Sequence, residues 1–212
     1  MTEIKICGLT CEKDIAAVNQ FLPDYVGFVL FFPKSKRNLS PRRASVLKKQ
    51  LDKKIKTVAV VVSPTKEHIQ MIEEIGFDYI QIHGKLTKEI YEQSSIPILR
   101  AFAVSDFDQI PEYESKEKIK GFVFDSKSPG SGKTFDWKLL STYKNGAKIL
   151  GKKMFLAGGI DETNVRKAIS ELLPDVIDVS SSVEQTGEDG GFYGKDPEKI
   201  KTIVRMVHEN EE

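Results

Sequence analysis

The segment Ile4-Lys5-Ile6-Cys7 alternates apolar and polar side chains along what otherwise has the composition of a buried β-strand. Two later segments repeat the alternation, Ile80-Gln81-Ile82-His83 and Ile177-Asp178-Val179-Ser180. Successive side chains of a strand point to opposite faces, and a parallel sheet that helices cover on both sides is expected to be apolar at every position. One face of these strands therefore looks into a confined space that accepts ionisable groups. A closed barrel with an active site at one rim has this property.

Short apolar segments alternate with amphipathic segments along the whole chain. Strands are predicted near 3–7, 25–31, 56–62, 78–83, 97–102, 120–125, 153–157 and 175–180. Helices are predicted near 11–21, 41–51, 65–75, 87–94, 106–115, 136–145, 162–172 and 196–208, and the fifth contains Pro111. Strand–helix pairs connected in the right-handed sense predict an α/β fold, a (β/α)₈ TIM barrel, with residues 1–212 forming a single domain. An open doubly wound sheet is the alternative.

Composition narrows the class of protein. The 212 residues contain 32 Lys and Arg against 31 Asp and Glu, so the formal charge is only +1, whereas nucleic-acid binding requires a basic excess. No apolar run approaches the length of a membrane span, and the first residues contain no apolar signal core. Cys7 and Cys11 lack a second Cys/His pair, so neither a structural zinc site nor a disulfide framework is expected. We expect a cytoplasmic protein that binds no nucleic acid, no membrane and no metal.

Candidate catalytic groups stand at the ends of predicted strands, where barrels of this kind carry their active sites. Cys7 ends the first strand and Asp125 ends the sixth, so they are expected to lie across the barrel mouth as a base and an acid. The plainer interpretations are an inert small apolar residue for Cys7 and a helix or loop cap for Asp125. His83 is interpreted as a hydrogen-bonded wall residue rather than a proton shuttle, and Asp178 as a spare inward-facing carboxylate. Both are placed in the substrate-binding set.

Two regions are candidates for binding anions. Gly158-Gly159 follows the seventh strand and Ser180-Ser181-Ser182 ends the eighth; loops at these positions often bind phosphate through backbone N–H groups, although paired glycines alone also suit a tight turn. Arg37 lies in a basic loop and is able to hold a carboxylate through its planar fork, with surface solubility as the plainer interpretation. The Gly-rich segment 128–134 is not a P-loop, because Lys127 occupies the position of the first Gly. A loop that closes over a ligand is the favoured interpretation.

A set of longer motifs recurs in order from one end of the chain to the other. They are Lys5-Ile6-Cys7-Gly8-Leu9-Thr10, Gly27-Phe28-Val29 with Pro33-Lys34-Ser35-Lys36-Arg37, Gln81-Ile82-His83-Gly84, Gly130-Ser131-Gly132-Lys133-Thr134-Phe135-Asp136-Trp137, Leu156-Ala157-Gly158-Gly159-Ile160, Asn164-Val165 and Asp178-Val179-Ser180-Ser181. Together they resemble the phosphoribosylanthranilate isomerase family of tryptophan biosynthesis. The chain departs from that family at Ser182, where Gly is usual, and in the Gly-rich segment 186–195, which is longer than usual.

The resemblance implies an Amadori rearrangement of N-(5-phosphoribosyl)anthranilate to 1-(2-carboxyphenylamino)-1-deoxyribulose 5-phosphate, without a metal or redox cofactor. It implies that Asp125 is the general acid that protonates the ribose ring oxygen and that the Cys7 thiolate removes the C2 proton. Arg37 would bind the anthranilate carboxylate. The predicted phosphate-binding set is Gly158, Gly159, Ser180 and Ser181. We add the hypothesis that Lys5, two residues before Cys7 on the same strand face, favours the thiolate, because a nearby cation lowers a thiol pKa.

Two other functions stay open. A histidine-pathway aminoaldose isomerase performs the same rearrangement, but those enzymes use a carboxylate at the end of the first strand, where this chain has Cys7. A catalytically silent barrel would bind a phosphorylated ligand or a partner protein, although it would have no need to keep both Cys7 and Asp125. The predicted partner is a small phosphorylated aminosugar, and a monomer is expected rather than a homodimer.

Overall fold

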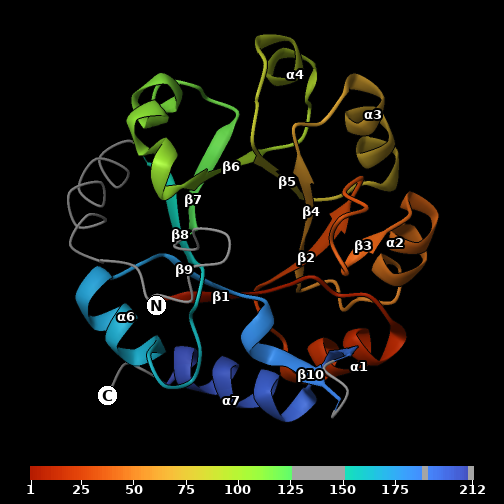
Figure 1. Cartoon of the computed structure of the whole chain (residues 1–212), viewed down its shortest axis with the longest axis vertical. Coiled ribbons are helices and arrows are strands. Elements are labelled where there is room, and N and C mark those ends of the chain that lie inside the picture. The colour runs from red at the N-terminus through yellow and green to blue at the C-terminus, as the bar shows by residue number, and fades with distance from the viewer. Residues whose placement is uncertain (126–150, 188–190, 210–212) are drawn as a thin grey trace.

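Eight parallel strands close into a barrel in the computed structural model, which describes residues 1–125, 151–187 and 191–209 (Figure 1). The strands are β1 (Glu3–Cys7), β2 (Tyr25–Leu30), β4 (Lys56–Val62), β5 (Tyr79–His83), β6 (Ile98–Ala103), β7 (Ile119–Asp125), β8 (Lys153–Ala157) and β9 (Val176–Val179). Each is hydrogen-bonded to the next, and β1 pairs with both β2 and β9, so the ring has no open edge. This closure confirms the predicted TIM barrel and excludes the open doubly wound sheet.

Helices surround the barrel on its outside (Figure 1). They are α1 (Glu12–Phe21), α2 (Pro41–Lys48), α3 (Lys66–Ile75), α4 (Lys88–Gln93), η1 (Val104–Tyr113), α6 (Val165–Leu172) and α7 (Pro197–His208). The predicted fifth helix is a 3₁₀ helix, η1, with Pro111 inside it; proline has no N–H to donate, which is unfavourable for a regular α-helix. The predicted helix 136–145 and the predicted closing loop lie outside the described residues. A short strand that was not predicted, β3 (Asn38–Leu39), pairs with the end of β2.

Helix starts coincide with capping residues visible in the sequence. Ser40 accepts a hydrogen bond from the N–H of Arg43 and precedes a proline at the first helical position of α2. Thr65 caps α3 in the same way, and Asp196 accepts from two N–H groups of the first turn of α7. These caps satisfy N–H groups that have no partner inside the helix. They fix where each helix begins relative to the strand before it.

Two apolar layers form the core. The layer inside the barrel consists of Tyr25, Val58, Val60, Leu99, Ala101, Val123, Phe155, Ala157 and Val176. The second layer lies between the strands and the helices and contains Ile4 and Ile6 of β1. Lys5, between these two isoleucines, is fully buried on the inner face. The alternation in the sequence therefore separates the two faces of the barrel wall as predicted.

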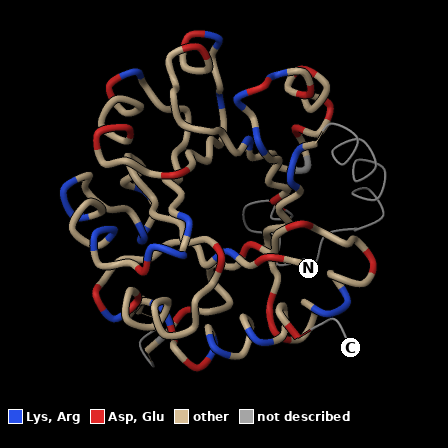
Figure 2. Tube along the Cα trace, turned by 180° about the vertical axis from the view of Figure 1, so that it is seen from behind, with Lys and Arg blue, Asp and Glu red and all other residues tan. Residues whose placement is uncertain are grey.

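A group of charged side chains lies at the N-terminal ends of the strands. Glu3 forms ion pairs with Lys56 and Lys153, and the Tyr25 hydroxyl contacts all three side chains. In barrels of this kind active sites lie at the opposite end, where the strands have their carboxyl termini. Basic and acidic residues are both distributed around the outer ring of helices and loops (Figure 2). None of the described helices combines the length and the apolar composition that crossing a bilayer requires.

A small hairpin follows β9 and was not predicted. The 3₁₀ turn η2 (Ser181–Val183) leads into β10 (Glu184–Thr186), which pairs antiparallel with β11 (Phe192–Lys195). Asp14 of α1 attaches this hairpin to the barrel, because its carboxylate accepts hydrogen bonds from the backbone N–H of Lys195 at 2.7 Å and of Thr10 at 2.6 Å. The hairpin thereby brings two charged residues, Glu184 and Lys195, to the rim of the barrel.

Candidate active site

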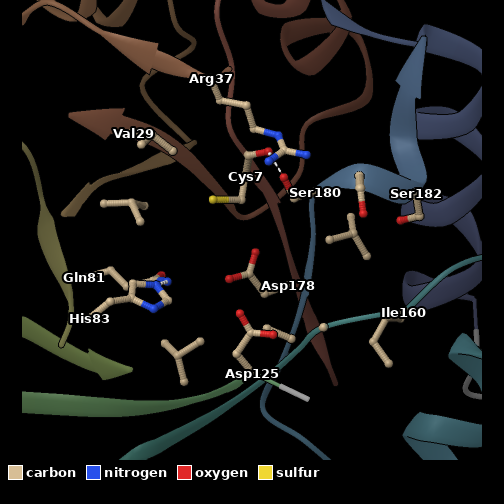
Figure 3. Close-up of a pocket in the computed structure, with 17 residues that line it drawn as sticks. Cys7, Val29, Arg37, Gln81, His83, Asp125, Ile160, Asp178, Ser180 and Ser182 are labelled. Atoms are coloured by element: carbon tan, nitrogen blue, oxygen red, sulfur yellow. Dashed lines mark hydrogen bonds between the residues drawn. The ribbon is translucent and has the colours of Figure 1, made fainter. Parts of the chain in front are cut away.

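A pocket of about 230 Å³ opens at the carboxyl ends of the strands (Figure 3). All the residues predicted for the catalytic, substrate-binding and phosphate-binding sets line this pocket: Cys7, Arg37, His83, Asp125, Gly158, Gly159, Asp178, Ser180 and Ser181. They come from β1, β5, β7, β9 and the loops after β2, β8 and β9. The structure thus brings together residues that are up to 174 positions apart in the sequence.

Two glycines make room for the side chains at the mouth of the pocket. Gly27 of β2 lies beside Cys7 in the paired strand, and a Cβ atom there would lie 2.8 Å from the Cys7 Sγ. Gly8 has φ +84°, and a Cβ atom there would collide with the Arg37 side chain. Only glycine adopts this backbone conformation without strain and leaves that space free. The thiol and the guanidinium both depend on a missing side chain next to them.

The Cys7 thiol ends β1 and points into the pocket (Figure 3). Burial raises its pKa, while the charges of Lys5 and Lys195 act in the opposite direction. Asp178 raises it further. Lys5 therefore has the sign that our hypothesis gave it, but its effect is smaller than the effect of burial. The balance of these effects favours the thiol form.

A chain of buried hydrogen bonds crosses the barrel interior. Lys5 Nζ donates to Asp178 Oδ2 at 2.6 Å and to Gln81 Oε1 at 2.9 Å. Burial alone would lower the pKa of Lys5, but the interactions of its ammonium group with Asp178 and Cys7 together outweigh burial and raise that pKa. Because an ammonium group only donates, Gln81 must turn its oxygen to Lys5 and its Nε2 toward His83, whose Nε2 is 2.8 Å away.

This chain determines the state of His83. The His83 Nε2 has to accept the hydrogen bond from Gln81, so the ring is neutral and carries its proton on Nδ1. Burial lowers the pKa of His83 to about 4, although the nearby Asp125 acts against it. A residue that stays neutral across the physiological range is poorly suited to shuttling protons. The geometry favours the wall interpretation.

Two carboxyl groups face the pocket from neighbouring parts of the wall. Asp125 ends β7, and Figure 3 shows its carboxyl group directed to the same space as that of Asp178. Asp178 Oδ2 is held by Lys5, whereas Asp178 Oδ1 is buried without a hydrogen-bond partner among the described residues. A buried oxygen of this kind is costly unless a ligand donates to it. Asp178 Oδ1 is therefore positioned to accept from a ligand hydroxyl.

Arg37 has a buried carboxylate as its partner. Its Nε donates to Glu184, which also pairs with Lys36 at 2.8 Å and lies 3.5 Å from Lys195 Nζ. Burial lowers the pKa of Lys195 to about 8, and the charges of Glu184 and Cys7 limit that effect. Sequence reasoning missed both Glu184 and Lys195. Charged residues in a Gly-rich tail gave a weak signal, and only the hairpin register brings them to the pocket.

The two loops predicted to bind phosphate lie side by side. Gly158 and Gly159 have φ values of +80° and +71°, a region that favours glycine. The Ser180 hydroxyl donates to the Cys7 carbonyl oxygen at 3.0 Å, which ties the end of β9 to the end of β1. The Ser182 hydroxyl oxygen is buried and has no hydrogen-bond partner among the described residues. In residues 1–125, 151–187 and 191–209 no group of three or more His, Cys, Asp and Glu side chains is arranged to hold a metal ion.

The sequence matches the family of N-(5'-phosphoribosyl)anthranilate isomerase over residues 4–206. The chain belongs to this family. A relative of that name from Clostridium kluyveri is 39% identical over 209 residues, covering 98% of both chains. Another, from Streptococcus mutans, is 36% identical over 208 residues and covers 98% of this chain and 99% of the relative.

Solved structures of the N-(5'-phosphoribosyl)anthranilate isomerase family have the same fold. The enzyme from Thermotoga maritima superposes with a TM-score of 0.84 at 32% identity, covering 99% of this chain and 100% of the other. A second structure, 29% identical with a TM-score of 0.81 and the same coverage, holds reduced 1-(o-carboxyphenylamino)-1-deoxyribulose 5-phosphate. A third, also from Thermotoga maritima and 29% identical, is described as monomers generated from a dimeric enzyme; its TM-score is 0.78, and 98% of this chain and 99% of the other are covered.

Proposed function

We infer that this protein is an N-(5'-phosphoribosyl)anthranilate isomerase that acts in tryptophan biosynthesis. The observation that carries the inference is the family match over residues 4–206, joined to one pocket that holds a thiol, a carboxyl group and an arginine. The reaction is an Amadori rearrangement, which opens an aminosugar ring and moves a proton from C2. It requires an acid and a base on one small substrate, and this pocket offers both.

Substrate binding is proposed to use the two ends of the pocket. The phosphate group would lie against Gly158, Gly159, Ser180 and Ser181, where backbone N–H groups and the open glycine conformations suit an anion. The terminal nitrogens of Arg37 would hold the anthranilate carboxylate. Between these ends, Asp178 Oδ1 would accept a hydrogen bond from a ribose hydroxyl.

Asp125 is proposed to start the reaction. In its protonated form it donates a proton to the ribose ring oxygen, and the bond between C1 and that oxygen breaks. The nitrogen lone pair then forms an iminium with C1, and the former ring oxygen becomes a hydroxyl group.

Cys7 is proposed to complete the reaction. Its thiolate removes the proton from C2, and the C–H bonding electrons form the double bond of an enolamine as the iminium nitrogen becomes neutral. Tautomerisation of the enol then yields the ketone product. Because burial raises the thiol pKa, the nearby ammonium groups of Lys5 and Lys195 are needed to offset the cost of forming the thiolate.

Turnover measurements test these roles. The decay of substrate fluorescence follows the reaction in wild type, Cys7→Ser and Asp125→Asn. Each variant is expected to lower kcat by roughly 10²–10⁴-fold, the usual contribution of one positioned proton transfer, while binding reduced product within a few fold of wild type. A loss of less than tenfold contradicts the role of that residue. Turnover of the histidine-pathway intermediate alone, or tight binding without turnover, would favour the two alternative functions.

We also propose that residues 1–212 form one domain and that the protein is a cytoplasmic monomer. A relative from Thermotoga maritima is described as dimeric, so the oligomeric state needs a measurement of its own. Sedimentation velocity across a hundredfold range of concentration separates the two states. A concentration-independent sedimentation coefficient of a single chain is the expected result.

A further inference from the structure

Glu184 lies at the centre of a group of cations beside the pocket. Its side chain is only 2% exposed. One carboxylate oxygen accepts from Arg37 Nε and lies 3.5 Å from Lys195 Nζ, and the other is 2.8 Å from Lys36 Nζ. Burial would raise the pKa of Glu184, but the hydrogen bonds from Arg37 and Lys36, together with the charges of Lys195 and Arg37, outweigh burial and lower that pKa. The carboxylate is therefore ionised and rigidly held.

Arg37 is bound to Glu184 through Nε, which leaves its two terminal nitrogens for other partners. Within the described residues, its side-chain hydrogen bond runs from Nε alone. The two terminal nitrogens remain on the side of the group that lines the pocket, above Cys7 and near Ser180 (Figure 3). Two parallel N–H groups of a fixed guanidinium match a carboxylate in a bidentate manner.

Glu184 is itself fixed from several directions. It starts β10 and pairs in register with Lys195 of β11. Its backbone carbonyl accepts from Lys199 Nζ at 3.1 Å, and β11 is anchored by Asp14. One carboxylate balances only part of the charge of the three cations around it, so this group of side chains keeps a positive excess that suits an anionic ligand.

We propose that Glu184 is a positioning residue that sets specificity for a carboxylate-bearing substrate. It holds Arg37 by Nε and so directs the two terminal nitrogens to the carboxylate on the aromatic ring of the substrate. This inference rests on the proposed function. It adds that recognition of the carboxylate depends on a residue that does not touch the substrate.

The test compares two inhibitors, reduced product and the same compound without the ring carboxylate. Dissociation constants for both are measured by calorimetry in wild type and in Glu184→Gln. We expect wild type to bind the carboxylated compound more tightly than the other. In the variant the ratio of the two dissociation constants is expected to fall roughly tenfold, which corresponds to the loss of one charge-assisted hydrogen bond. The affinity of Glu184→Gln for the compound without a carboxylate is expected to differ less than twofold from that of wild type. A general loss of structure would instead weaken the binding of both compounds.

Glu3→Gln is the matched control. Glu3 is also a carboxylate held by two lysines, but it lies at the opposite end of the barrel. This variant is expected to keep the full preference. If Glu184→Gln does not fold, Glu184→Asp, which retains the charge on a shorter side chain, is expected to lose part of the preference. In an Arg37→Ala background, which removes the preference, a change at Glu184 is expected to add nothing.

The outcomes separate this proposal from the proposed function. If wild type turns over the substrate and Glu184→Gln keeps the preference, or weakens both ligands equally, the positioning role is overturned and the function stands. If wild type neither turns over the substrate nor distinguishes the two inhibitors, both inferences are overturned.

Discussion

The space that the Cys7 thiol occupies is defined by a single absent side chain on the neighbouring strand. Gly27 does not have a positive φ, so its backbone accepts alanine, but the new Cβ would lie 2.8 Å from the Cys7 Sγ. We expect Gly27→Ala to displace the thiol and to lower kcat by about tenfold or more, because a shift near 1 Å at the reacting group is sufficient for such losses. Steady-state kinetics and a thermal unfolding curve measure both effects.

Gly76→Ala is the control for that prediction. Gly76 ends α3 with φ +75°, and a Cβ atom added there would have no neighbour within 4 Å. Alanine at this position is expected to cost about 1 kcal/mol of stability through backbone strain and to leave turnover unchanged. If Gly27→Ala retains wild-type turnover, the position of the thiol is not critical and the role of Cys7 as the base is in doubt.

His83 makes stability depend on pH in the acidic range. Its pKa is about 4 in the folded protein, against an ordinary value of 6.5. Between these values the unfolded chain binds a proton that the folded protein does not, so the free energy of unfolding falls as the pH decreases from 6.5 to 4. The decrease due to His83 is expected to be about 3 kcal/mol. Urea unfolding at several pH values, compared between wild type and His83→Gln, measures it.

His208 should show the opposite dependence. The hydrogen bond to Asp24 raises the pKa of His208. Its contribution is therefore complete below its unfolded pKa and disappears as the pH rises through its folded pKa. His208→Gln is expected to lose stability relative to wild type at acidic pH and to match it at alkaline pH.

For His83, the contradicting outcome is equally clear. If the free energy of unfolding of His83→Gln depends on pH as steeply as that of wild type, His83 is not held neutral as the hydrogen-bond chain requires.

Among the elements, the β10–β11 hairpin depends on one acidic residue of α1. The fully buried Asp14 carboxylate accepts from three donors in residues 10–11 and from the Lys195 N–H. An amide would direct an NH₂ group at one of these donors. We expect Asp14→Asn to lower the free energy of unfolding by about 1–3 kcal/mol and to increase amide hydrogen exchange in β11.

Asp196→Asn provides the corresponding control. Asp196 caps α7 by accepting from two N–H groups, and asparagine caps helices about as well as aspartate. Little change in stability is expected, and hydrogen exchange of β11 should stay as in wild type. If Asp14→Asn leaves β11 as protected as before, the hairpin is held by its ion pairs rather than by Asp14.

Helices and strands were predictable where the sequence pattern that specifies them lies within a few residues. Strand alternation and capping residues lie within a few positions, so β1, α3 and α7 began or ended close to where the sequence indicated. The hairpin gave no such signal, because its strands are short and its register shifts between Glu184 and Thr186. Its position is fixed by contacts with α1 and α7, which no local pattern in the segment 184–195 contains.

For the whole molecule, it was predictable that the candidate site residues lie together, because in a barrel the position of a residue along its strand determines where it lies. Cys7, His83 and Asp125 each end a strand, and parallel strands place their ends on one rim. The pairing of Arg37 with Glu184 and the neutral state of His83 were not predictable. Both depend on side-chain directions across the interior, and in particular on the orientation that Lys5 imposes on Gln81.

The pairing of β1 with β9, which closes the barrel, affects when the active site forms during synthesis. Lys5 and Asp178 meet across this pair of strands although 173 positions separate them, and Ser180 bonds to Cys7 over an equal span. During synthesis Cys7, the proposed base, leaves the ribosome long before β9, the strand that completes its surroundings. A ribosome-bound chain that ends before Asp178 therefore carries a thiol with no ammonium–carboxylate pair beside it. The active site is therefore expected to form only after β9 has been synthesised and has paired with β1.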